Sequence, residues 1–136
     1  MNSYKITPHT ADVRLEVKAD SMAGLFATAL SGMSQIIKKD FCQINQNHSQ
    51  NMTISIKSLE PTTLLIDFLS EILTLSHIKK IVFCQVKFIT LTETKLIAEI
   101  LGSKVEQFDE DIKAVSYHGA QILKDKGGNY QVNIIF

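Results

Sequence analysis

The chain has 136 residues, which is the length of one domain, and we expect a single domain over residues 1–136. Hydrophobic residues make up 45% and charged residues 21% of the chain, a ratio that excludes intrinsic disorder. The 14 Lys and Arg residues are matched by 14 Asp and Glu residues. Proteins that coat nucleic acids need surplus cations to displace counterions from phosphates, so this balance argues against direct nucleic-acid binding.

The cysteines and the N-terminal residues indicate in which cellular compartment the protein is expected. Cys42 and Cys84 lie 42 residues apart, and neither has a partner at the spacing of a zinc site. Cys84 ends the apolar run 81–84, which predicts a buried, inert thiol in a reducing environment. The chain shows no apolar signal core and no stretch of roughly 20 apolar residues that would span a membrane. We therefore expect a soluble, cytoplasmic protein with reduced cysteines.

Two amphipathic helices are predicted, over residues 21–38 and 61–76, because apolar residues recur there at steps of three and four. Either Asp20 or Ser21 can cap the first helix. The glycines within it, at positions 24 and 32, weaken it by about 1 kcal/mol each and would allow close packing. Pro61 suits the first position of the second helix, where a missing N–H costs nothing.

The remaining segments alternate between apolar and polar residues and predict strands. A turn at 126–129 would join the last strand to residues 121–124, and 43–50 reads as a polar loop. The predicted strands cover residues 13–19, 52–57, 112–117 and 130–136, together with a hairpin formed by 81–90 and 95–101. The predicted fold is α+β: a largely antiparallel sheet system with two helices packed against it.

His9 and Asp12 are the first candidate site, just before a predicted strand. A histidine and a carboxylate three residues apart can bind a metal or act as an acid–base pair. The alternative is a polar turn in which the Asp side chain accepts hydrogen bonds from nearby backbone N–H groups. Spacing alone favours the turn.

Lys113 and His118 are the second candidate site. A strand over 112–117 would place their side chains on opposite faces. Lys113 could then meet an anion, and His118 a ligand or His9; the alternative is an exposed lysine and a hydrogen-bonded histidine. The acidic run 109–111 is typical of a solvated loop, though it could support a cation, and we expect the histidines at positions 48 and 77 to be exposed. With no recognised catalytic motif present, the residues by themselves do not indicate an enzyme.

Three motifs resemble those of the archease family. Residues 9–13 (HTADV) precede a capped amphipathic helix, as in that family's opening. Residues 64–73 (LLIDFLSEIL) are similar to its LLxxWLxELL helix, with Phe in place of Trp, and residues 113–119 (KAVSYHG) to its KAVTYHG strand, with Ser in place of Thr. The order and separation of all three also agree, and the resemblance covers nearly the whole chain.

The resemblance implies an accessory protein rather than an enzyme. Archeases assist the GTP-dependent RNA ligase of the RtcB type in tRNA splicing and RNA repair, promoting guanylylation of the ligase histidine and multiple turnover. Asp12 matches the metal-binding aspartate of the family's HTAD motif, and Lys113 matches the lysine of its KAVTYHG strand. We therefore expect His9, Asp12, Lys113 and His118 to contribute to activating the partner.

One departure concerns the family's divalent metal, calcium or similar. Archeases usually end in an aspartate plus one apolar residue, and that aspartate helps to bind the metal. The present sequence ends at Phe136 and has no aspartate at that place. The Phe136 carboxylate would fall roughly 6–7 Å short of the aspartate's place. Calcium takes six to eight oxygen ligands, so Asp12 and Phe136 would need help from loop oxygens or from 109–111.

Two other functions remain open. A general chaperone or modulator of nucleic-acid-processing proteins would use the helices and edge strands as a docking surface, without depending on Asp12. A small metal-dependent hydrolase would use His9, Asp12 and His118 and would need no partner.

Overall fold

The computed structural model describes residues 1–8 and 12–136. Its elements are β1 (Ser3–Pro8), β2 (Val13–Ala19), α1 (Met22–Ile37), α2 (Phe41–Ile44), β3 (Gln50–Lys57), α3 (Pro61–Lys79), β4 (Ile81–Leu91), β5 (Lys95–Lys104), β6 (Leu123–Lys124) and β7 (Tyr130–Ile135). They form two antiparallel sheets, one in the order β1-β2-β7-β6 and one in the order β3-β5-β4. The predicted α+β class is confirmed.

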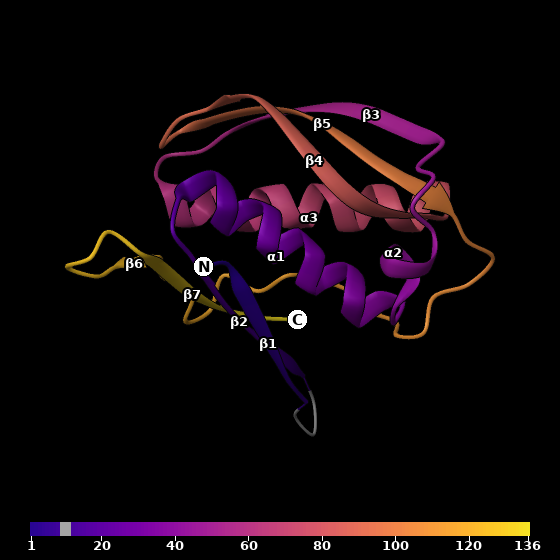
Figure 1. The fold of residues 1–136 in the computed structure, drawn as a ribbon, viewed down its shortest axis with the longest axis horizontal. Helices are drawn as coiled ribbons and strands as arrows, with labels where there is room; N and C mark the ends of the chain where they lie inside the picture. The colour runs from indigo at the N-terminus through magenta and orange to yellow at the C-terminus, as the bar shows by residue number, and fades with distance from the viewer. Residues whose placement is uncertain (9–11) are drawn as a thin grey trace.

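The two long helices lie between the sheets (Figure 1). α1 packs against β2 on one side and against β4 on the other, so its apolar residues contact both sheets. α3 packs against α1 and the three-stranded sheet. The rings of Phe26, Phe68 and Phe88 meet in this layer, with centroids 5.6 to 6.4 Å apart, and tie both helices to β4.

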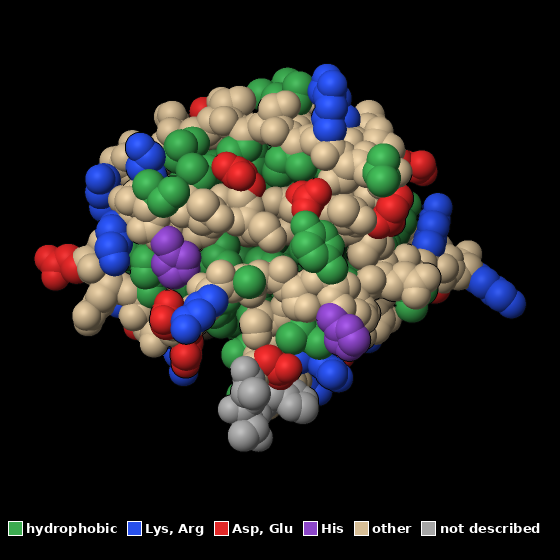
Figure 2. Space-filling model, turned by 180° about the vertical axis from the view of Figure 1, so that it is seen from behind, with side chains coloured by type: hydrophobic (Ala, Val, Ile, Leu, Met, Phe, Trp, Pro, Cys, Tyr) green, Lys and Arg blue, Asp and Glu red, His purple; other side chains and the backbone are tan. Residues whose placement is uncertain are grey.

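The surface carries charges of both signs. On the face drawn in Figure 2, acidic and basic side chains are interspersed with apolar ones, and the described side chains form no broad field of one sign there. None of the described helices has the length and apolar character needed to cross a bilayer.

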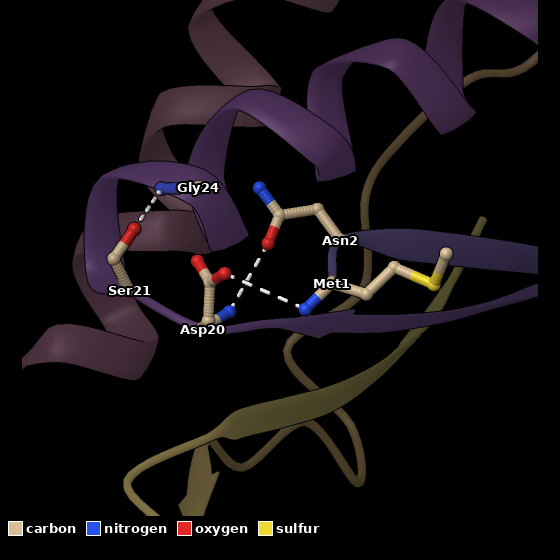
Figure 3. Close-up of polar contacts among 5 residues, drawn as sticks. All are labelled: Met1, Asn2, Asp20, Ser21 and Gly24. Carbon is tan, nitrogen blue, oxygen red and sulfur yellow. Dashed lines mark hydrogen bonds and ion pairs between the residues drawn. The ribbon is translucent and has the colours of Figure 1, made fainter.

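Of the two candidate caps of α1, Ser21 is the one used (Figure 3). Its Oγ accepts a hydrogen bond from the backbone N–H of Gly24 at 3.0 Å. Asp20 has a different role, because its carboxylate pairs with the N-terminal ammonium of Met1 at 3.4 Å. Its backbone N–H also donates to the side-chain oxygen of Asn2 at 3.1 Å, so Asp20 joins the start of β1 to the end of β2.

The helix glycines, whose packing the sequence left open, both lie close to neighbouring side chains. A Cβ on Gly32 would lie 2.6 Å from Leu15 Cδ1, so a side chain at this position would require Leu15 to move. In α3, Pro61 occupies the first turn and Glu60 caps it, as the sequence indicates for the proline. This helix continues to Lys79, three residues beyond the predicted end, and stops at Lys80, which is in the left-handed conformation.

The predicted hairpin, the strand after the first loop and the final turn are confirmed, while one predicted strand is wrong. Residues 112–117 form no strand and make only an isolated bridge between Ser116 and Ile135. The buried residues here are Ile112 and Val115, which are three apart and so do not follow the period of two that a strand requires. Two further elements, β1 and α2, were not predicted: β1 is mostly exposed, and α2 has only four residues, none of them fully buried.

The expectation of two reduced cysteines is wrong in this structure, because Cys42 and Cys84 form a disulfide with a Cα–Cα distance of 5.5 Å. Cys42 lies on α2. Cys84 lies at a β-bulge. Phe83 pairs with Gly102 of β5 and Gln85 with the adjacent Leu101, so Cys84 between them has no partner in the ladder. The spacing of 42 residues in sequence gave no sign of this proximity.

Candidate functional site: a charged groove between two strand ends

An open groove of about 630 Å³ lies where β2 begins and β7 ends. The segment between β5 and β6 forms its other side. Among the residues that line it are Asp12, Lys113 and Phe136, which the sequence singled out, and the acidic Glu110 and Asp111. Residues from three distant parts of the chain therefore meet at one surface.

The pairing of β2 with β7 brings Asp12 and Phe136 together. The backbone N–H of Phe136 donates to the carbonyl oxygen of Val13 at 2.9 Å, and that of Val13 donates to the Phe136 oxygen at 3.3 Å. Asp12, which directly precedes Val13, is half-buried. The sheet register thus fixes the backbone of both groove residues.

Lys113 comes from the segment that crosses beside β7. The backbone N–H of Ser116 donates to the Ile135 carbonyl oxygen at 2.8 Å, and the side chains of Ile112 and Val115 are buried on either side of Lys113. Lys113 itself is exposed. Its ammonium and the Asp12 carboxylate are therefore offered at the same groove, neither of them sealed in the core.

The three acidic residues at 109–111 have two different roles. The Asp109 carboxylate accepts hydrogen bonds from the backbone N–H of Lys39 at 2.9 Å and from Lys38 Nζ at 3.3 Å. These bonds, the one from Lys39 above all, hold the pKa of Asp109 below its usual range. Glu110 and Asp111 line the groove instead. Asp109 therefore ties the segment to the end of α1, and its two neighbours add negative charge to the groove.

The described residues do not fit the metal that the resemblance implies. Within residues 1–8 and 12–136, no three side chains of His, Cys, Asp or Glu lie close enough together to hold a metal ion. Calcium requires six to eight oxygen ligands, which Asp12 and Phe136 do not supply. The expected calcium ligation by Asp12 and Phe136 therefore gains no support from the described residues.

Two of the described histidines, His48 and His77, are more buried than expected. His9 lies outside the described residues, so its proposed role is untested. His118 is exposed, its backbone N–H donates to Ser116 Oγ at 3.0 Å, and it is not among the described residues that line the groove. His48 and His77 were expected to be exposed, and both are half-buried.

Two contacts from α3 to the segment were missed by the sequence analysis. His77 Nε2 lies 2.9 Å from the carbonyl oxygen of Ile112. Asp67 accepts a hydrogen bond from Ser58 Oγ at 2.5 Å and another from the Tyr117 hydroxyl. The bond to Asp67 raises the pKa of Tyr117. Asp67 and Tyr117 are 50 residues apart, so no local pattern could have paired them.

The fold and the groove together define a small α+β protein with two sheets around a helical layer and an open, charged surface site. Residues 4–136 match the archease protein family (MTH1598/TM1083), and the chain belongs to that family. A curated relative, protein archease from Methanosarcina barkeri, is 29% identical over 92% of this chain and 89% of its own length. Protein archease from Pyrococcus abyssi is 28% identical over 99% of this chain and 98% of its own.

A solved structure supports the fold. The solution structure of protein 1598 from Methanobacterium thermoautotrophicum superimposes with a TM-score of 0.78, over 98% of this chain and 96% of that chain. The two sequences are 21% identical, so this likeness establishes the shared architecture. The archease resemblance seen in the three sequence motifs is thereby confirmed at the level of family and fold.

Proposed function

We propose that this chain activates an RtcB-type, GTP-dependent RNA ligase in the cytoplasm, promoting guanylylation of the ligase and its multiple turnover. Membership of the archease family supports an accessory role, since the relatives carry a name that denotes no reaction. The observation that carries the proposal is the placement of Asp12 and Lys113 at one open groove. This open groove carries one basic side chain, Lys113, beside the acidic side chains of Asp12, Glu110 and Asp111, and such a charged surface suits docking against another protein.

The chemistry follows from the two side chains. Transfer of a nucleotidyl group develops negative charge on phosphate oxygens, and a positioned ammonium group stabilises that charge once water is excluded. Lys113 would supply the ammonium group. Asp12 would accept hydrogen bonds or pair with a cationic side chain of the ligase, which fixes how the two proteins dock.

The test is multiple-turnover ligation by the ligase from the same organism, with and without this protein. We expect Asp12→Ala and Lys113→Ala each to lower the stimulated rate at least tenfold. Lys124→Ala is the matched control, because Lys124 is an exposed lysine on β6, away from the residues that line the groove. Full stimulation by both groove variants would refute the proposed roles.

The two alternatives find less support. The hydrolase would need His118 beside Asp12, and His118 is not among the described residues lining the groove. The general chaperone would bind several clients regardless of Asp12, so binding of unrelated nucleic-acid-processing proteins by Asp12→Ala would favour it. The ligase experiment therefore separates these functions.

A further inference from the structure

Lys113 lies between two attachments of its segment to α3. On one side, the carbonyl oxygen of Ile112 accepts a hydrogen bond from His77, which requires a proton on Nε2 because a carbonyl can only accept. On the other side, the Tyr117 hydroxyl donates to the Asp67 carboxylate. The same helix therefore holds the segment just before and a few residues after the groove lysine.

These attachments matter because the segment has no strand ladder. Between residues 112 and 118, its backbone pairs with the sheet only at the bridge of Ser116 to Ile135. The position of a segment with so few backbone hydrogen bonds depends on each side-chain contact that remains.

The contact of Tyr117 with Asp67 contributes little to global stability. The Tyr117 residue is 56% exposed, so its hydroxyl is at the surface and removing it opens no cavity in the core. Asp67 would keep its hydrogen bond from Ser58. The bond is therefore better suited to fixing local geometry than to holding the fold together.

We propose that Asp67 and Tyr117 are positioning residues for Lys113, an inference that rests on the proposed function of the groove. Together with His77, they hold the backbone on both sides of Lys113, so that when the ligase docks only the lysine side chain, and not its backbone, has to become ordered. A charged group that must first become ordered spends part of its interaction energy on that ordering, so it stabilises the transition state less. Even a small displacement of such a group lowers the reaction rate strongly.

The first experiment measures the rate of ligase guanylylation as a function of the concentration of this protein. We expect Tyr117→Phe to lower the rate at saturation about 5- to 10-fold while the half-saturating concentration stays the same. A purely structural role would reduce the folded fraction, which raises the half-saturating concentration and leaves the saturated rate unchanged. Ser58→Ala is the matched control, because it removes the other hydrogen bond to Asp67, and it should behave as the unaltered chain.

The second experiment asks whether the effect passes through Lys113. In a Lys113→Ala background, Tyr117→Phe should cause no further loss. Asp67→Asn keeps an acceptor oxygen for the hydroxyl and should retain most of the saturated rate, whereas Asp67→Ala should match Tyr117→Phe. An unchanged saturated rate for Tyr117→Phe, or the same fold loss with and without Lys113, would overturn the inference.

A third measurement needs no ligase. Amide hydrogen exchange of residues 112–118 should become faster in Tyr117→Phe and stay unchanged in Ser58→Ala. Unchanged exchange in Tyr117→Phe overturns the positioning inference alone. If the unaltered chain fails to stimulate the ligase, the proposed function itself is wrong and the positioning role falls with it, so the two failures are distinguishable.

Discussion

Cys42 on α2 and Cys84 at the bulge of β4 are joined by a disulfide across 42 residues of sequence. The bulge explains the geometry, because it frees Cys84 from the strand ladder at the point where α2 approaches β4. The bond fastens a four-residue helix with no buried residue to the edge of the three-stranded sheet.

Reduction of this disulfide should destabilise the protein. Closing a loop of 42 residues restricts the unfolded chain by up to about 4 kcal/mol in the loop-entropy treatment. We expect urea unfolding with a reductant to show a lower midpoint than unfolding without it. The double variant Cys42→Ser/Cys84→Ser is the control and should be insensitive to the reductant, while equal midpoints for the unaltered chain would show that the bond is absent or contributes nothing.

Gly102 should not tolerate a side chain. A Cβ there would lie 2.1 Å from the carbonyl oxygen of Val82, a backbone atom in a buried strand that has little room to move. We expect Gly102→Ala to lower the free energy of unfolding by roughly 2–3 kcal/mol, as overpacking does.

Gly127→Ala is the matched control in the same denaturant titration. Its added Cβ would meet only ordinary contacts, at 3.4 Å and beyond, so the expected change is small. If the two variants were equally stable, the bulge would have to relax around the new methyl group.

Ser21 caps α1 and Asp20 forms an ion pair with the N-terminus, and thermal unfolding can test these two roles separately. Ser21→Ala removes the oxygen that accepts from the Gly24 N–H and should cost about 1 kcal/mol. Asp20→Ala removes only an exposed ion pair with Met1 and should change stability by less than about 0.5 kcal/mol. The reverse order would mean that Asp20 is the effective cap.

The elements that were predicted correctly from the sequence are those determined by local signals. The two helices, the strand over 13–19 and the central hairpin rest on periodicity and capping residues close in the chain, and all are present. The segment 112–117 was mistaken for a strand because Val115 and its neighbours favour extended structure, whereas the core takes Ile112 and Val115 at a spacing of three.

The groove was foreseen only in part. The family motifs pointed to Asp12 and Lys113, and the structure brings both to the groove, although their roles remain predictions. The partners of Asp67 and Cys84 lie 50 and 42 residues away in sequence, and such pairings are decided by the packing of whole elements. A single sequence contains no local signal for them.

Asp109 should make stability depend on pH in the acid range. Its pKa is lowered in the folded protein, chiefly by the hydrogen bond from the backbone N–H of Lys39 and further by Lys38. The unfolded chain therefore binds the proton more readily, so the stabilisation is fully present above the unfolded pKa of about 4 and is lost as the pH falls through the lower, folded pKa.

We expect Asp109→Asn to be less stable than the unaltered chain at pH 6, with the difference shrinking steadily below about pH 4. Thermal midpoints measured from pH 6 to pH 3 would show this convergence. Asp111→Asn is the matched control, because the neighbouring Asp111 lines the groove and does not share the hydrogen bonds that Asp109 accepts from residues 38 and 39, so it should be as stable as the unaltered chain at pH 6. A constant gap between Asp109→Asn and the unaltered chain would mean that the Asp109 carboxylate holds the segment through its shape rather than its charge.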